Sequence, residues 1–71
     1  MSTNPRVFNT EMGDYRAKVF YDREWEEYQV KLYWRGLPIP EATYHTDDRD
    51  DAERTAKHMV LEAYQKQIKP N

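Results

Sequence analysis

One stretch of strict alternation, residues 28–35, constrains the fold of this chain more than any other feature. Every second residue in it is apolar or aromatic, namely Tyr28, Val30, Leu32 and Trp34. The residues between them are Gln29, Lys31, Tyr33 and Arg35. A period of two is typical of a β-strand with one buried face and one exposed face. The stretch therefore predicts a strand whose exposed side is basic and carries an aromatic ring.

Two neighbouring segments extend this strand into a predicted antiparallel sheet. Residues 14–21 alternate in the same manner, and a charged connection leads from them to the central strand at 26–35. The connection lacks an Asn-Gly pair, so we expect a loop of about three to five residues. After Gly36, Pro38 and Pro40 lead into a short third strand at 40–46. We expect it to be an edge strand, because proline donates no hydrogen bond to a neighbouring strand. The result is a three-stranded β-meander.

A C-terminal helix is predicted over residues 48–67. Thr46, Asp47 and Asp48 are residue types that cap a helix start, and acidic residues favour the positive end of the helix dipole. Apolar residues then recur at helical spacing, at Ala52, Ala56, Met59, Val60, Ala63, Tyr64 and Ile68. We therefore predict an α+β fold in which the helix packs on one face of the sheet and leaves the other face open.

The chain length of 71 residues allows one small domain. We expect this domain to span residues 14–69, and we expect the polar residues 1–13 to form a flexible N-terminal arm. The predicted core consists of inward-facing strand residues and the helical stripe: Tyr15, Ala17, Val19, Tyr28, Val30, Leu32, Trp34, Ala42, Tyr44, Ala56, Met59, Val60 and Ala63.

Several chemistries are disfavoured by the residues that the chain contains. It has no cysteine, which excludes disulfides and thiolate metal sites. His45 and His58 are too far apart in sequence for a recognised zinc spacing. The acidic run that starts at Asp47 has Ala52 and His58 where a calcium loop needs glycine and glutamate. We expect no metal and no cofactor.

Catalysis and membrane insertion are disfavoured as well. The one serine is Ser2, and Gly13 and Gly36 are too few for a phosphate-binding loop. No apolar run approaches the roughly 20 residues that cross a bilayer, and the N-terminus lacks the features of a signal peptide. We expect a cytoplasmic, monomeric protein that is not an enzyme and has no membrane association.

The open face of the predicted sheet is the main candidate for a binding surface. Its candidate residues are Arg16, Lys18, Phe20, Lys31, Tyr33 and Arg35. A second candidate is a docking segment in the arm, formed by Arg6, Val7 and Phe8. The face fits three interpretations: a protein-docking surface, a nucleic-acid site with stacking aromatics, or a solvated sheet. The net charge of −2 and the acidic helix start disfavour nucleic acid.

The segment from Tyr28 to Met59 resembles small proteins of tailed bacteriophages. The resemblance is carried by Tyr-Gln-Val-Lys-Leu-Tyr, then Gly36, then Glu-Ala-Thr-Tyr-His-Thr-Asp-Asp and Asp-Ala-Glu-Arg-Thr-Ala-Lys-His-Met, about 30 of the 71 residues. It implies a phage-encoded protein that binds and modulates a host enzyme. Host RNA polymerase is the first candidate, and inhibition of a host defence nuclease by charge mimicry is the alternative.

A looser resemblance links the helix to double-stranded RNA-binding domains, which also place a helix behind a three-stranded sheet. The run Ala52-Glu53-Arg54-Thr55-Ala56-Lys57 is similar in rhythm to their C-terminal helix. Those domains carry basic residues at the helix start, whereas this chain has Asp47, Asp48, Asp50 and Asp51 there. The resemblance implies shared architecture only.

Overall fold

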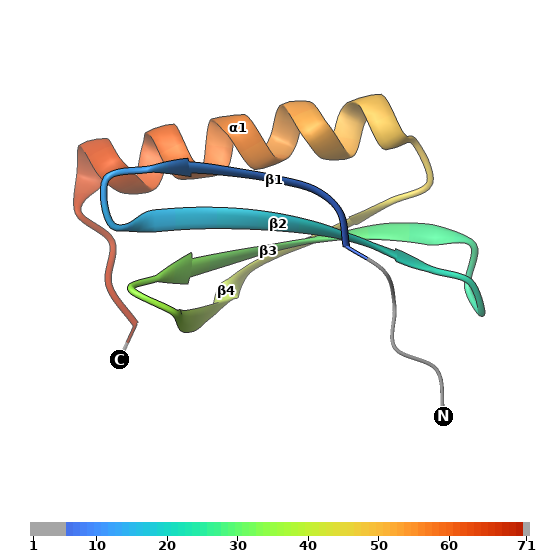
Figure 1. The fold of residues 1–71 in the computed structure, drawn as a ribbon, viewed down its shortest axis with the longest axis horizontal. Helices are drawn as coiled ribbons and strands as arrows, with labels where there is room; N and C mark the ends of the chain where they lie inside the picture. The colour runs from blue at the N-terminus through green and yellow to red at the C-terminus, as the bar shows by residue number, and fades with distance from the viewer. Residues whose placement is uncertain (1–5, 71) are drawn as a thin grey trace.

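An antiparallel sheet with one helix across one of its faces makes up the fold (Figure 1). The computed structural model describes residues 6–70. The elements in chain order are β1 (Arg6–Met12), β2 (Tyr15–Asp22), β3 (Glu27–Trp34), β4 (Leu37–Thr46) and α1 (Arg49–Lys66). Each strand pairs with the next along the chain, which gives the sheet order β1-β2-β3-β4. The predicted α+β class and the C-terminal helix on the sheet are confirmed.

Within residues 6–70 the sheet has four strands, so the prediction of three is wrong. The additional strand, β1, lies where we expected a flexible arm, and it pairs with β2 from Arg6 opposite Phe20 to Met12 opposite Tyr15. A register shift between Arg6 and Phe8 interrupts the alternation at the start of the strand, and the polar Thr10 takes the position opposite the buried Ala17. The period of two is therefore weak in the sequence. The remainder of the expected arm, residues 1–5, lies outside the described residues.

Two short turns join strands at the same end of the sheet. Gly13 is the first residue of the two-residue turn between β1 and β2, and its φ is 60°. Two-residue hairpin turns need a positive φ at this position, which glycine adopts readily. Arg35 and Gly36 join β3 to β4 with φ values of 49° and 84°, the pattern of a type I′ turn. Because this turn is so short, β4 begins at Leu37 rather than at the predicted residue 40.

The edge strand β4 is irregular in its middle. Its pairing with β3 shifts between Val30 and Leu32, and the Thr43 hydroxyl donates a hydrogen bond to the Pro40 carbonyl at 3.0 Å across the irregularity. The prediction that Tyr44 lies in the core is wrong, since 37% of this residue is exposed. Tyr44 sits on an edge strand, which among the described residues has a neighbouring strand on one side only.

The core lies between α1 and the sheet. Its buried residues are Tyr15, Ala17, Val19, Val30, Leu32, Ile39, Ala52, Ala56, Val60 and Ala63. Alanines dominate the buried stripe of α1, so the helix backbone comes close to the strands. Tyr28, Trp34, Ala42 and Met59, which were predicted as core, are partly buried and pack against it, as do Val7, Phe8 and Met12 of β1.

The ends of α1 agree with the predicted helix to within one residue. Asp48 is the N-cap, and its side chain accepts hydrogen bonds from the backbone N–H groups of Asp50 and Asp51. Gln67 ends the helix in the left-handed conformation and donates its backbone N–H to the Ala63 carbonyl. Among the described residues, no helix is long and apolar enough to cross a membrane.

Candidate functional site

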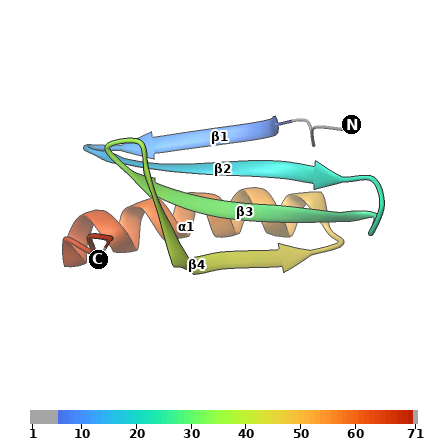
Figure 2. The ribbon, with the colours of Figure 1, turned by 90° about the horizontal axis from the view of Figure 1, so that it is seen from below.

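The face of the sheet opposite α1 is not covered by any described element (Figure 2). The structure places Arg16, Lys18 and Phe20 on this face from β2, because they alternate with buried residues of the same strand. Lys31 and Tyr33 of β3 are placed there by the same alternation. This group of predicted site residues is therefore brought together on one surface.

The centre of the open face is an arrangement that we call the lysine–aromatic quartet: Lys18, Lys31, Phe20 and Tyr33. Lys18 and Lys31 lie directly opposite each other on the paired strands. The Lys18 Nζ lies 4.6 Å from the centroid of the Tyr33 ring, and the Lys31 Nζ lies 5.6 Å from that of Phe20. Each ammonium therefore crosses diagonally to an aromatic ring on the partner strand, and the two lysines lean in opposite directions.

The quartet concentrates positive charge that nothing described neutralises. Like charges directly opposite each other destabilise a sheet, whereas an exposed cation–π contact contributes about 0.5–1 kcal/mol in the other direction. Within residues 6–70, neither Lys18 nor Lys31 forms an ion pair. All members of the quartet are half-buried, so the side chains lie packed along the sheet. The centre of the face thus presents two cations flanked by aromatic surface.

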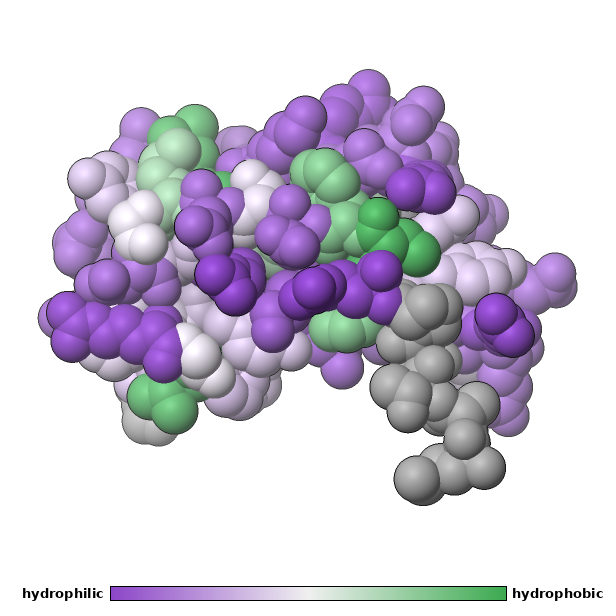
Figure 3. Space-filling view, in the orientation of Figure 1, coloured by the Kyte–Doolittle hydropathy of each residue, from purple (hydrophilic) through white to green (hydrophobic). Residues whose placement is uncertain are grey.

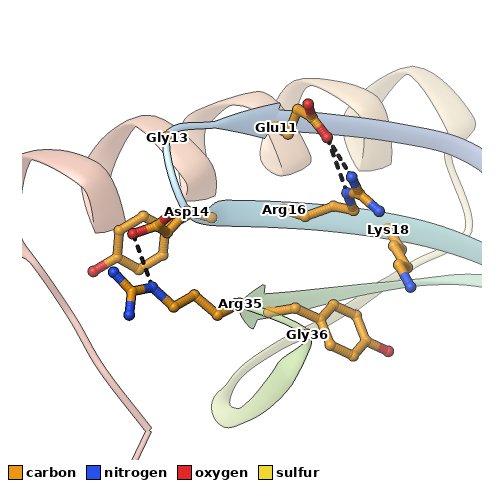
Figure 4. Close-up of a pocket in the computed structure, with 9 residues that line it drawn as sticks. Glu11, Gly13, Asp14, Arg16, Lys18, Arg35 and Gly36 are labelled. Atoms are coloured by element: carbon orange, nitrogen blue, oxygen red, sulfur yellow. Dashed lines mark hydrogen bonds and ion pairs between the residues drawn. The ribbon is translucent and has the colours of Figure 1, made fainter.

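The two arginines predicted for this face are, in contrast, paired with acids. Arg16 donates from its Nε to Glu11 at 3.1 Å and also from its Nη2, and Arg35 donates from its Nε to Asp14 at 3.1 Å (Figure 4). The backbone N–H of Arg35 also donates to the Asp14 carbonyl at 2.9 Å, which links the two short turns. Glu11 belongs to the segment expected as an arm, and Asp14 begins the first predicted strand; neither was predicted as a partner of these arginines.

A hollow of about 280 Å³ lies beside the quartet, at the end of the sheet with the two short turns. Figure 4 shows the paired Glu11–Arg16 and Asp14–Arg35 side chains around it. Lys18 also lines the hollow and is the cation there without an acid partner among the described residues. The arginine charges in the hollow are therefore largely compensated, and Lys18 marks where the hollow borders the positive centre of the face.

The predicted docking segment of Arg6, Val7 and Phe8 is not a separate arm. Val7 and Phe8 pack against the core, and the Val7 carbonyl accepts a hydrogen bond from Arg49 at 3.3 Å. The Lys57 Nζ lies 5.8 Å from the Phe8 ring, so both residues belong to the contact between β1 and α1. Arg6 is exposed and lies opposite Phe20, at the margin of the open face.

Other chemical groups show no comparable convergence. Among residues 6–70, no three His, Cys, Asp or Glu side chains lie together in a way that could hold a metal ion. His45 is placed beside Glu27, with its Nδ1 3.1 Å from the carboxylate. In the view of Figure 3 hydrophilic residues dominate, and apolar residues form small separate patches.

Comparisons of the chain with protein-family models, with curated proteins and with solved structures give no match. The candidate site therefore rests on its own geometry and charge.

Proposed function

We propose that this chain is a small non-enzymatic regulator that binds another protein through the open face of its sheet. The observation that carries the proposal is the lysine–aromatic quartet. Its opposed lysines cost folding free energy, and no described acid compensates them. An acidic surface on a partner protein would supply the missing negative charge, and the flanking rings would supply apolar contact.

A protein fits this face better than a nucleic acid does. Arg16 and Arg35 are held by Glu11 and Asp14, so their charges are largely compensated. These carboxylates also stand at the margin of the positive centre, where they would repel phosphates. Few free cations release few counterions, and counterion release supplies much of nucleic-acid affinity. Aromatic side chains surrounded by a polar rim are, however, typical of protein interfaces.

The resemblance of Tyr28–Met59 to phage proteins supports a bacterial enzyme as the partner. Host RNA polymerase is the first candidate, and binding would act by steric occlusion in the cytoplasm. The alternative is inhibition of a host defence nuclease by charge mimicry, for which the acidic start of α1 is the relevant feature.

The test is a comparison of proteins captured from a bacterial lysate by the wild-type chain and by a Lys18→Glu, Lys31→Glu variant. The matched control is Arg54→Glu, Lys57→Glu, which reverses the same number of charges on exposed positions of α1. We expect a partner that binds wild type and control but not the sheet variant. Binding of the purified partner should weaken with salt, because the contact is electrostatic.

Two results would contradict the proposal. The first is that the lysate contains no partner that distinguishes wild type from the sheet variant, whether because the partner binds both equally or because none is captured. The second is tight, steeply salt-dependent binding of DNA or RNA oligonucleotides by wild type that is lost in the sheet variant, which would identify the face as a nucleic-acid site.

A further inference from the structure

Trp25 is the most exposed large hydrophobic residue among those described, with 72% of its surface accessible. It lies in the turn that joins β2 to β3, outside both strands. Tryptophan is enriched among the residues that dominate protein interfaces, because it brings a large apolar surface with few rotatable bonds. The core does not use this side chain, so folding alone gives no reason for a tryptophan here.

The turn holds Trp25 in a defined position. The Asp22 Oδ1 accepts hydrogen bonds from the backbone N–H of Glu24 at 3.0 Å and from that of Trp25 at 3.3 Å. The other Asp22 oxygen accepts from the Gln29 amide at 3.1 Å, which ties the turn to β3. Glu26 completes the turn with a φ of 50°. A preformed turn loses little conformational entropy when it binds, so more of the contact energy appears as affinity.

The charges around Trp25 indicate what kind of surface it fits. Glu24 and Glu26 flank it directly, and neither forms an ion pair with another residue in the range 6–70. Arg23 is the one cation between Asp22 and Glu27. Carboxylates on the residues next to Trp25 repel nucleic acid and anionic membranes. They complement an apolar pocket with basic residues around its rim.

The position of the turn relates it to the open face. In Figure 1 the β2–β3 turn, at the right end of the sheet, bends away from α1, which is the side of the open face. We infer that Trp25 is a second anchor for the partner protein of the open face and inserts into an apolar, basic-rimmed pocket on that partner. The inference rests on the proposed function, because it assigns both contacts to one partner.

The test uses the partner that is purified through its dependence on Lys18 and Lys31. Trp25→Ala should weaken its binding about tenfold or more, as truncation of an interface hot spot does. Glu24→Lys, Glu26→Lys should weaken it too, because both substitutions place cations against the basic rim. Arg23→Ala is the control in the same turn and should leave affinity within about twofold, since surface positions contribute little.

A fluorescence measurement tests insertion directly. The chain contains two tryptophans, so Trp34→Phe leaves Trp25 as the only reporter. On addition of the partner, we expect the emission of Trp25 to shift to shorter wavelength and acrylamide quenching to fall. Unchanged emission together with full affinity of Trp25→Ala overturns the inference but leaves the proposed function standing.

Other binding partners of Trp25 would give distinct results. A blue shift with vesicles of zwitterionic phospholipid identifies a membrane, and a blue shift that depends on protein concentration alone identifies a second copy of the chain. Either result overturns the inference. If no partner depends on Lys18 and Lys31, the proposed function fails and the inference fails with it.

Discussion

Gly13 and Gly36 both occupy turns with positive φ, but only Gly13 is also pressed against a side chain. A Cβ atom added at Gly13 would lie 2.7 Å from the Tyr64 Cε1 and 2.8 Å from its Cδ1, whereas nothing lies within 4 Å at Gly36. We expect Gly13→Ala to lower the free energy of unfolding by roughly 2–3 kcal/mol, and Gly36→Ala by about 1 kcal/mol.

Urea denaturation of the two variants measures this difference. The double variant Gly13→Ala, Tyr64→Ala removes the ring that the added methyl group meets. The loss of unfolding free energy in the double variant should therefore be smaller than the sum of the losses in the two single variants. Equal losses of unfolding free energy in Gly13→Ala and Gly36→Ala would contradict the expectation. They would show that the Tyr64 ring moves away from the added methyl group at no cost in free energy.

The Tyr44 hydroxyl donates a hydrogen bond to the Asp51 carboxylate at 2.7 Å, which connects β4 to the first turn of α1. This bond lowers the pKa of Asp51 below its ordinary value of 3.8, with a smaller contribution from Thr46. The same bond raises the pKa of Tyr44 above 10.0. A lowered carboxyl pKa contributes stability that is present above pH 3.8 and is lost as the pH falls through the folded-state value.

We therefore expect Tyr44→Phe to return the pKa of Asp51 toward 3.8, and to reduce the loss of stability in acid. At the alkaline end, the raised pKa of Tyr44 contributes stability up to about pH 10.0 that is lost above it, and this loss should also disappear in the variant. NMR titration of the Asp51 carboxyl carbon checks the first expectation. Tyr64→Phe is the control, and an unchanged Asp51 titration in Tyr44→Phe would contradict the assignment.

At the scale of the elements, β1 is an integral part of the domain. Phe8 packs against the core, whereas its neighbour Asn9 lies opposite Lys18 on the other face of the sheet. We expect Phe8→Ala to lower the free energy of unfolding by about 2 kcal/mol, because it removes apolar surface between β1 and α1. Asn9→Ala is the matched control and should change stability by less than about 0.5 kcal/mol. Similar values for both variants would mean that β1 contributes little to the fold.

The elements differ in how closely they can be predicted from the sequence. In β2 and β3 each buried residue alternates with an accessible one, and α1 has a regular apolar stripe with an acidic cap, so their bounds were predicted closely. In β1 the register shift turns both Val7 and Phe8 toward the core, so regular alternation begins only at Phe8. The available signal was Gly13-Asp14, a pair that is typical of two-residue hairpins.

At the scale of the whole molecule, charge is divided along the long axis. The acidic start of α1 and the turn that carries Trp25 lie at one end in Figure 1, and the two short turns lie at the other, with the end of α1. Lys66 and Lys69 belong to this second end, while the lysine–aromatic quartet occupies the middle of the open face. A partner would therefore meet positive charge at the centre and negative charge near Trp25, which fixes its orientation.

The opposed lysines lead to an expectation that separates binding from folding. Lys31→Glu replaces a like-charged cross-strand pair with an opposite-charged one, which favours the fold, but it also removes the contact with Phe20. These effects offset each other, so the free energy of unfolding should stay within about 1 kcal/mol of wild type. Partner binding should nevertheless be lost. A loss of more than about 2 kcal/mol in urea denaturation would show that Lys31 is needed for the fold itself.

Sequence patterns alone were enough to predict the α+β class, the helix and the composition of the open face. These features follow from local periodicity, which each segment carries without reference to its neighbours. The pairing of strands in space was needed to show that residues 6–12 form a strand. This strand and its turn bring Glu11 to Arg16 and Asp14 to Arg35. The same pairing determines which cations of residues 6–70 have no acid partner in that range, because charge compensation depends on the register between strands and not on the order of residues within one.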